Sequence, residues 1–381
     1  MKTTNTLRVF ADAHVFDNEY QGTRTFLKEI YTHLSGKENV RIFLGAYDID
    51  NLKNNFPAHS NITFIKYKNR SGFARLLYDI PLILKKHQID FAHFQYIIPP
   101  LKVCRYIVTI HDVIFKEYPR EFPLLYRLSR SFLFKRAAAK AEMISTVSDY
   151  SKKSIEKYLH VNADRVALIP NGVSKLYFKQ YDKQHSKNII QEKYGIGNFI
   201  LYVSRFEPRK NHESLLKAFL DLRLYEQGYT LVLLGHKSLK IKRFDKILNE
   251  LPGDIRKYIF ISSKINAGEL ITFYQSATAF IYPSRCEGFG ISPLEAAAVK
   301  IPVLCSNTTA MKDFSFFGDM HIDPDDYELF KKKLEEIITN PPDEMHLLEI
   351  SNTIRKKYSW EKSAEDFYQL LLQGRTNRKS E

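Results

Sequence analysis

The chain has 381 residues, which is too many for one ordinary hydrophobic core and predicts two domains of similar size. Hydrophobic residues make up 44% of it and charges of both signs are mixed along its length, which excludes an intrinsically disordered protein. Its 57 Lys and Arg against 43 Asp and Glu give a formal net charge of +14, which favours an anionic partner such as a nucleotide, a nucleic acid or lipid headgroups.

Several common classes of sequence feature are missing. The amino-terminal residues MKTTNTLRVFADAHVF lack the apolar core and cleavage site of a signal peptide. No segment approaches the roughly 18–20 apolar residues of a membrane span. The cysteines Cys104, Cys286 and Cys305 are odd in number and widely spaced, which argues against a disulfide framework or a cysteine-based metal site. We therefore predict a cytoplasmic protein.

Short runs of β-branched and aromatic residues alternate with helical patterns along the chain. Several runs are almost continuously apolar, as is typical of parallel strands covered on both faces. Two such series predict an α/β protein with two doubly wound parallel sheets. The expected strands are 7–12, 40–46, 62–67, 90–96, 105–110, 142–148 and 165–170 in the first series, and 199–204, 229–235, 257–262, 278–283 and 301–306 in the second.

The polar stretch 174–198 contains no clear strand, so we place the domain boundary near its start. The predicted domains are 1–174 and 175–357. Residues 358–375 include an amphipathic helix, with Ser359 as its N-cap, that we expect to pack back on the first domain. Ligands of such sheets bind beyond the carboxyl ends of the strands, so the chemistry should lie in the loops that follow the strands and face a cleft between the domains.

The stretch SRCEGFGISPLEAAA follows the expected strand 278–283 and contains a glycine-rich turn. We expect the next helix to begin with Ser292 as its N-cap and Pro293 as its first residue. The backbone amides from Gly288 to Gly290, with the positive end of that helix, would then suit a phosphate group.

Two glutamates flank this turn. Ser292 and Glu295 have the spacing of a capping box, in which the glutamate would bind the N-cap amide. Ligand binding is an equally open interpretation of Glu295. Glu287 has no such structural explanation, and an ionised carboxylate beside a glycine turn suits sugar hydroxyls, which are good hydrogen-bond donors.

The sequence YPSRCEGFGISPLEAAAVKIPVLCSNTTAMKDF resembles the E-x7-E region of family 4 of the retaining glycosyltransferases, whose fold of two Rossmann-like domains is called GT-B. The resemblance runs from about residue 20 to the final helix. It departs at Ser204 and Lys300, where glycine is usual, so donor specificity is less transferable. The matching residues are Glu287, Gly288, Phe289, Gly290, Pro293, Glu295, Ala296, Pro302 and Val303.

The resemblance implies roles for residues of the second domain. LYVSRFEPRKNHESLLKAF is similar to the family segment whose arginine and lysine bind the donor diphosphate, which assigns this role to Arg205 and Lys210. Arg209 is expected to face solvent. Glu287 would hold the donor sugar, Glu295 would bind the ribose hydroxyls, and the turn Gly288, Phe289, Gly290 would contribute its amides.

The resemblance also implies roles in the first domain. TIHDVIF is similar to the family's His-Asp segment, which places His111 near the donor sugar and makes Asp112 a weaker contact. YQGTRTFLKEI resembles the glycine loop before the first long helix. There Gly22 would let backbone amides approach the diphosphate, and Arg24 would touch donor or acceptor.

The implied reaction is transfer of mannose or another hexose from a GDP- or UDP-linked donor to an acceptor hydroxyl, with retention of configuration and without a metal or other cofactor. Such an enzyme would serve the assembly of bacterial-type surface polysaccharide, lipopolysaccharide or glycolipid. Three other interpretations stay open. They are a nucleotide-sugar epimerase, a phosphorylase of the same architecture, and a nucleic-acid-binding protein, although no nucleic-acid recognition motif is present.

The segment FPLLYRLSRSFLFKRAAAK (122–140) mixes Leu, Phe and Tyr with five cations at roughly helical spacing. One interpretation is a helix on an anionic membrane surface, which would suit a lipid-linked glycan acceptor at the inner face of the membrane. The other is an ordinary helix with a core stripe and a solvated basic face. The five cations are Arg127, Arg130, Lys135, Arg136 and Lys140.

Overall fold

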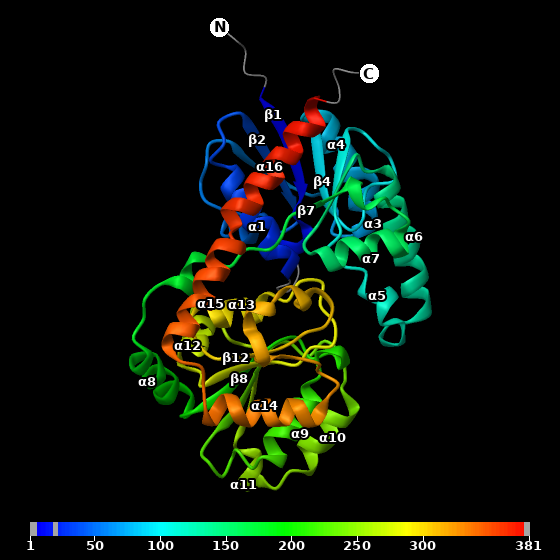
Figure 1. The fold of residues 1–381 in the computed structure, drawn as a ribbon. Helices are drawn as coiled ribbons and strands as arrows, with labels where there is room; N and C mark the ends of the chain where they lie inside the picture. The colour runs from blue at the N-terminus through cyan, green and yellow to red at the C-terminus, as the bar shows by residue number, and fades with distance from the viewer. Residues whose placement is uncertain (1–5, 18–21, 377–381) are drawn as a thin grey trace. The chain divides into compact units, whose positions relative to one another are not determined.

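The computed structural model describes residues 6–17 and 22–376, and the chain divides into two compact α/β units (Figure 1). The first unit comprises Met1–Gly172 with Trp360–Glu381, and the second comprises Val173–Ser359. The expected boundaries, after residues 174 and 357, each differ from these by two residues (174 against 172, 357 against 359).

Within the described residues, the first unit has a parallel sheet of seven strands in the order β3-β2-β1-β4-β5-β6-β7. This is the order of a dinucleotide-binding sheet. All strands are parallel, and it is the order in which the chain adds them that reverses between β1 and β4. The strands are β1 (Leu7–Asp12), β2 (Val40–Ala46), β3 (Ile62–Lys66), β4 (Phe91–Gln95), β5 (Arg105–Thr109), β6 (Met143–Thr146) and β7 (Val166–Leu168). The helices are α1 (Gly22–Leu34), α2 (Ile49–Lys53), α3 (Gly72–Ala74), the π-helix η2 (Arg75–Asp79), α4 (Ile80–Lys86), α5 (Ile114–Glu117), α6 (Leu124–Lys140), α7 (Asp149–Leu159) and α16 (Trp360–Thr376).

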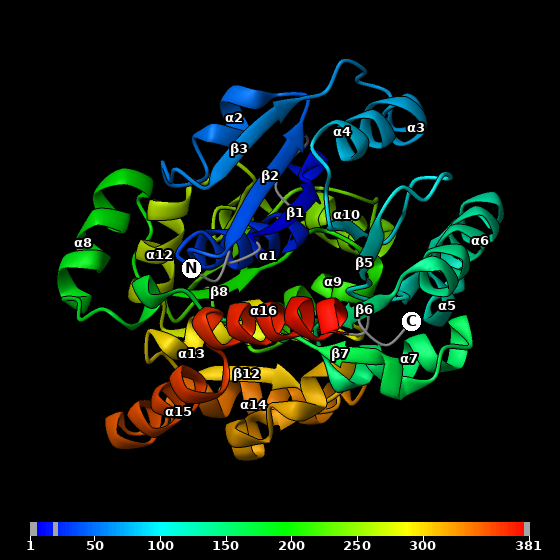
Figure 2. The same cartoon turned by 90° about the horizontal axis from the view of Figure 1, so that it is seen from above.

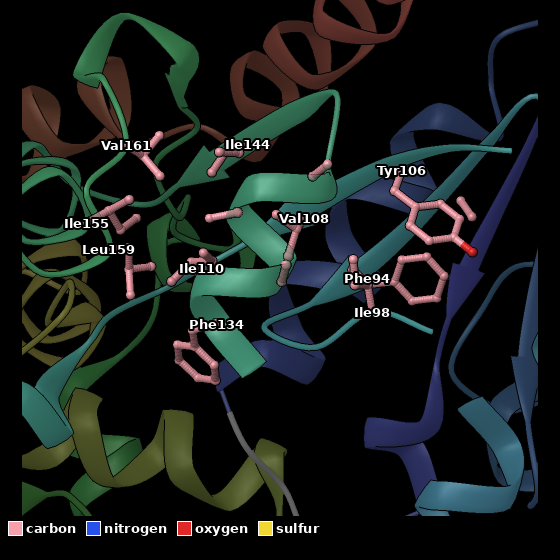
Figure 3. Close-up of a cluster of buried hydrophobic side chains, with 14 of the residues drawn as sticks. Phe94, Ile98, Tyr106, Val108, Ile110, Phe134, Ile144, Ile155, Leu159 and Val161 are labelled. Carbon is pink, nitrogen blue, oxygen red and sulfur yellow. The ribbon is translucent and has the colours of Figure 1, made fainter. Parts of the chain in front are cut away.

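One hydrophobic core of the first unit lies between its sheet and the helices α4, α6 and α7 (Figure 3). Phe94, Val108 and Ile144 come from neighbouring strands, and Phe134 and Ile155 come from α6 and α7. Helices α1 and α16 cover the other face of the sheet. Burial on both faces explains why these strands are almost continuously apolar in sequence.

The carboxy-terminal helix α16 packs on α1 of the first unit. The ring of Phe367 lies 6.1 Å from that of Tyr31 and 4.9 Å from that of His93, centroid to centroid. At the edge of this contact Lys37 forms an ion pair with Glu365 at 2.7 Å. A buried aromatic contact with a charged rim therefore attaches the end of the chain to the first unit.

Within the described residues, the second unit repeats the same topology with six strands in the order β10-β9-β8-β11-β12-β13, reversing between β8 and β11. Helices α9, α10 and α14 gather on one side of its sheet, and α8, α12 and α13 on the other (Figure 1). The strands are β8 (Phe199–Val203), β9 (Thr230–Leu234), β10 (Ile259–Ser262), β11 (Ala279–Tyr282), β12 (Val303–Ser306) and β13 (His321–Ile322). The helices are α8 (Lys183–Tyr194), the 3-10 turn η6 (Pro208–Lys210), α9 (His212–Asp221), α10 (Lys242–Glu250), α11 (Gly253–Arg256), α12 (Ala267–Ser276), α13 (Ile291–Ala298), α14 (Tyr327–Thr339) and α15 (Glu344–Lys357).

The predicted class, two doubly wound parallel sheets, is confirmed, and every strand expected from the sequence is present. The strand β13 was not predicted, because two residues are too short to show a periodicity. The stretch 174–198, expected to hold the boundary, contains helix α8, whose N-cap Asp182 accepts hydrogen bonds from the amides of Gln184 and His185.

We expect Phe367→Ala to lower the free energy of unfolding of the first unit by about 3–5 kcal/mol, because it leaves a cavity beside Tyr31 and His93. Trp360, the single tryptophan of the sequence, lies in this unit, so its fluorescence during urea unfolding reports the change. The exposed Gln369→Ala on the same helix serves as the control and should change stability by less than about 0.5 kcal/mol. Equal losses of stability from the two substitutions would contradict a stabilising contact of Phe367 with Tyr31 and His93.

Candidate active site

The candidate site residues of the second unit lie where its strand order reverses. Strands β8 and β11 pair with each other there, and the loop after each strand carries part of the predicted set. Arg205 and Lys210 follow β8, while Glu287 and the glycine turn follow β11 and lead into α13. The topology thus brings together residues about eighty positions apart at the edge where ligands of such sheets bind.

A buried charge cluster joins these two loops. Glu287 forms an ion pair with the Lys210 ammonium, and its Oε1 accepts a hydrogen bond from the Tyr282 hydroxyl at 2.9 Å. Burial alone would raise the pKa of Glu287, but Lys210 and Arg209 outweigh it and lower that pKa to about 2. Burial lowers the pKa of Lys210, and the Glu287 carboxylate opposes this effect. Glu287 is therefore an ionised carboxylate held by cations.

Arg209 completes the cluster, and the prediction that it faces solvent is wrong. Its side chain is only 5% exposed, and its guanidinium contacts Glu207 at 2.6 Å and Glu287 at 3.5 Å. Its Nη1 also donates to the Cys286 carbonyl at 2.5 Å, and its own carbonyl accepts from the Arg285 amide at 2.8 Å. The turn η6 directs this side chain inward, which the run of charges in the sequence did not reveal.

Arg205 differs from its two cationic neighbours in exposure. Its side chain is 50% exposed and contacts Glu207 through Nη2 at 3.1 Å. Glu207 is thereby shared between the buried Arg209 and the exposed Arg205. Exposed ion pairs are weak, so Arg205 can exchange this partner for a bound anion at little cost.

The start of α13 differs from the prediction. The helix begins at Ile291, with Gly290 as its N-cap at φ 89°, rather than with Ser292 and Pro293 as expected. A Cβ at Gly290 would lie 2.9 Å from Cγ of Met311, so both the backbone angle and the close packing require glycine. Pro293 falls in the first helical turn, where its missing N–H leaves no intrahelical bond unmade.

This geometry removes the capping-box interpretation of Glu295, since α13 has no side-chain hydrogen bond at its N-cap. Instead the Glu295 carboxylate accepts a hydrogen bond from the Tyr274 hydroxyl at 3.1 Å. Burial raises the pKa of Glu295 to about 7, while hydrogen bonds from Tyr274 and Tyr177 oppose the rise. The carboxyl group therefore titrates near neutral pH, an unusual property for a glutamate with a purely structural role.

Phe289 anchors the glycine turn within the second unit. Its ring packs edge-on against Phe314 at 6.3 Å and Tyr358 at 5.7 Å between centroids. Gly288 and Gly290 on either side of it are buried in the same loop. Lys300, which departs from the family's glycine, has φ 60°, so the backbone there has the left-handed form that glycine favours.

In the first unit, His111 follows β5 and is buried. The amide of Gln95 at the end of β4 donates to the Thr23 carbonyl at 3.2 Å, so its Oε1 acts as the acceptor for His111 Nε2 at 3.1 Å. Burial lowers the pKa of His111 to about 3, so the ring is neutral. The bond to Gln95 places the proton on Nε2 and leaves Nδ1 as the acceptor nitrogen.

The other predicted residues of the first unit surround the start of α1. Gly22 is the first residue of that helix and is exposed, and a Cβ there would meet nothing within 4 Å. Arg24 lies 4.8 Å from the ring of Phe16 and donates to Asn51 at 3.3 Å. Asp112 accepts from the Ile114 amide at 3.2 Å, which makes it a turn residue. The first two residues of the stretch YQGTRTFLKEI lie outside the described residues.

Residues 6–17 and 22–376 contain no group of three or more His, Cys, Asp or Glu side chains placed to hold a metal ion. In the same part of the chain we find no helix with the length and apolar character needed to cross a membrane.

Two family models match the chain. Residues 20–175 match the model described as Glycosyltransferase Family 4, and residues 182–356 match the model described as Glycosyl transferases group 1. Together the two matches span most of both units.

Relatives of known description are also glycosyltransferases. Over 309 residues the chain is 26% identical to the O-antigen chain mannosyltransferase B of Escherichia coli, covering 76% of this chain and 79% of that protein. Over 230 residues it is 26% identical to the O-antigen chain mannosyltransferase RfbU of Salmonella typhimurium, and this match covers only 60% of each protein.

Among solved structures, a sucrose-phosphate synthase from Thermosynechococcus elongatus has a similar fold. The TM-score is 0.78 at 17% identity, over 98% of this chain and all of that one (100%). At this identity the likeness bears on the fold alone, and the predicted GT-B architecture is confirmed.

We expect Arg209→Met to lower the free energy of unfolding of the second unit by about 3–5 kcal/mol, because it leaves Glu207 and Glu287 buried without a shared partner. Arg205→Met is the matched control and should cost no more than about 1 kcal/mol, since that side chain is half exposed. Urea unfolding followed by far-UV circular dichroism measures both. Comparable losses in the two variants would show that the buried cluster carries no special stability.

A second prediction concerns pH. The folded chain keeps the Glu295 proton up to a pKa of about 7, whereas the unfolded chain loses it near the ordinary value of 4.5. The folded state therefore binds more protons between these values, and this contribution to stability is lost as pH rises from 4.5 to 7. We expect Glu295→Gln to gain thermal stability relative to the wild type as pH rises from 5 to 8. Exposed Glu349→Gln is the control, and parallel curves for wild type and Glu295→Gln would refute the raised pKa.

Proposed function

The chain belongs to the family 4 glycosyltransferases, and from this premise we propose that it moves mannose or another hexose from a GDP- or UDP-linked donor to an acceptor hydroxyl with retention of configuration. The observation that carries the proposal is the cationic cluster of Arg205, Arg209 and Lys210 at the carboxyl ends of β8 and β11. A departing nucleoside diphosphate develops negative charge, which such a cluster stabilises.

Arg209 holds Glu207 and Glu287 in place, and the other two cations act on the diphosphate. Arg205 contacts the diphosphate directly, since it is half exposed and its partner Glu207 is already bound to Arg209. Lys210 stabilises the leaving group from its buried place beside Glu287. The amides from Gly288 to Gly290 and the amino-terminal end of α13 add fixed dipoles. Together these groups supply what a metal ion supplies elsewhere, so we expect turnover without one.

The two glutamates bind the uncharged parts of the donor. Glu287 is ionised and accepts from a hydroxyl of the donor sugar, in addition to the cations that orient it. Glu295 accepts hydrogen bonds from the ribose hydroxyls through its carboxyl group, which lies beside Tyr274 and has a pKa of about 7. In the first unit, the neutral His111 offers Nδ1 as an acceptor to the donor sugar. Gly22 lets backbone amides approach the diphosphate, and Arg24 contacts the donor or the acceptor.

The proposed reaction proceeds on one face of the sugar. The bond between the anomeric carbon and the diphosphate oxygen breaks, which leaves an oxocarbenium-like ion beside the diphosphate. The acceptor oxygen attacks from the same face and its proton passes to the departing diphosphate oxygen. Arg205 and Lys210 lower the barrier because the charge they offset is larger in the transition state than in the bound donor.

The acceptor is a glycan in the proposal, because the relatives described above are named as O-antigen chain mannosyltransferases. Their activity supports assembly of a bacterial-type surface polysaccharide or lipopolysaccharide as the process served by this chain. The matches to glycosyltransferase models do not favour the epimerase, phosphorylase or nucleic-acid interpretations.

The test is a thermal-shift panel of GDP, UDP, ADP, GDP-mannose and UDP-glucose, with and without EDTA. A nucleotide at a hundred times its dissociation constant should add about 2.7 kcal/mol to stability. Arg205→Met should bind that nucleotide more weakly and lose about 10²–10³ in kcat, measured as release of nucleoside diphosphate from the donor. Its own thermal stability should stay near that of wild type.

Arg223→Met, another exposed arginine of the second unit, is the matched control and should match wild type in both assays. A panel without any shift, or turnover abolished by EDTA, would overturn the proposal. The anomeric configuration of the product, read by NMR, separates retaining transfer from epimerisation.

A further inference from the structure

Exposed hydrophobic side chains are concentrated on one part of the first unit. Of the large hydrophobic residues exposed in the described chain, ten lie between residues 73 and 132 and six lie elsewhere. Among the ten, the most exposed are Leu125 at 81%, Phe73 at 75%, Phe132 at 68% and Leu82 at 66%. Isolated exposed hydrophobic residues are normal, but a concentration of this kind marks an interaction surface.

Helix α6 carries half of these residues, and only its second half fits the ordinary core-stripe interpretation. Phe134, Ala137 and Ala138 are its only buried residues, all in its second half. Leu125, Leu128 and Phe132, at helical spacing i, i+3 and i+7, form a stripe on the side away from the core. The first half of α6 therefore presents an apolar face to the surroundings.

A second segment brings further apolar side chains to the same side of the unit. Leu82 of α4 and Phe73 of α3 are exposed, while Ile80 and Leu84 of α4 pack in the same core as Phe134 of α6. Figure 2 shows α3, α4 and α6 along the same side of the first unit. Helices that share a core on one face of the sheet direct their opposite sides outward together.

The loop between β4 and β5 is held against α6. Arg136 of α6 donates to the carbonyls of Pro99 at 3.0 Å and Pro100 at 2.6 Å, and Lys102 donates to the Lys140 carbonyl at 3.1 Å. The next residue after the prolines, Leu101, is 60% exposed. We call residues 73–82, 101–103 and 124–135 the docking surface.

Cations accompany the docking surface, and several have no acidic partner. In the described chain we find no ion pair for Lys116, Arg127, Arg130 or Lys135. Burial lowers the pKa of Lys116, and the positive charges of Lys135 and Arg127 lower it further because like charges repel.

Three acidic groups close by have partners other than Lys116, Arg127, Arg130 and Lys135. Glu117 accepts from Ser154, Asp79 accepts from Asn69, and Glu142 pairs with Lys102. The field around the docking surface is therefore positive.

We propose that the docking surface binds the enzyme to an anionic lipid bilayer, with Leu125, Phe132 and Phe73 entering the headgroup region and the neighbouring cations contacting lipid phosphates. Leucine and phenylalanine among unpaired lysine and arginine are the chemistry that recognises such a surface. Docking here goes beyond sugar transfer and would hold the enzyme where lipid-linked acceptors lie.

The test measures co-sedimentation of the full chain with vesicles, in the absence of any sugar nucleotide, so its outcome is independent of the transferase proposal. Wild type should bind phosphatidylcholine vesicles that contain about 30 mol% phosphatidylglycerol, and should bind vesicles of pure phosphatidylcholine far more weakly. Arg127→Gln with Lys135→Gln should lower the partition coefficient roughly fivefold per cation. Leu125→Ser with Leu128→Ser and Phe132→Ser should lower it on the order of a hundredfold or more.

Matched controls come from the second unit. Lys332→Gln with Lys356→Gln removes two exposed cations, and Ile189→Ser with Met345→Ser and Leu348→Ser removes three exposed apolar side chains. Both should bind vesicles as wild type does, and circular dichroism should show every variant folded. Equal binding by control and docking-surface variants would overturn the proposal. Equal binding to neutral and anionic vesicles would also overturn it. So would a dimer in sedimentation velocity that the triple serine variant no longer forms, because the apolar face would then be covered by a second copy of the chain.

Discussion

The contact between Arg209, Glu287 and Lys210 is the interaction on which the candidate site depends. It joins the loop after β8 to the loop after β11, because Arg209 binds the backbone at Arg285 and Cys286 as well as the Glu287 side chain. Each of these charges is buried, so removing any one would weaken the compensation of another. The cluster is therefore stable only as a whole, and it holds the two loops at one spacing while Arg205 stays exposed to meet a ligand.

The two units repeat one topology but carry different chemistry at their reversal points. The second unit gathers ionised groups beside a glycine turn, which suits a diphosphate. In the first unit, Asp12 at the end of β1 is a buried carboxylate paired with Arg75, whereas the ends of β4 and β5 carry neutral histidines. Burial lowers the pKa of both His93 and His111 to about 3, and His93 bridges Tyr31 and Thr109 with hydrogen bonds of 3.1 and 2.7 Å. Neutral donors and acceptors of this kind suit sugar hydroxyls rather than phosphates.

The fold could be predicted well because its strands are buried on both faces. β1 and β2 coincide with the expected ranges, and the other expected strands differ by one or a few terminal residues, where turn residues and hydrogen bonds decide the end. The errors at the site have local causes. Because the backbone at Gly290 is left-handed, α13 begins earlier in the chain than expected. The turn η6 directs the Arg209 side chain inward. Neither event leaves a signature in the pattern of apolar and charged residues.

The sequence by itself determined the fold class and the family and identified Arg205, Lys210 and Glu287 as candidates, because apolar periodicity and short motifs are properties of neighbouring positions. It could not decide whether Glu295 caps a helix, whether Arg209 is solvated, or whether Leu125 and Phe132 belong to a core. Only the tertiary structure decided these questions, since each depends on burial and on charges supplied by residues distant in the chain.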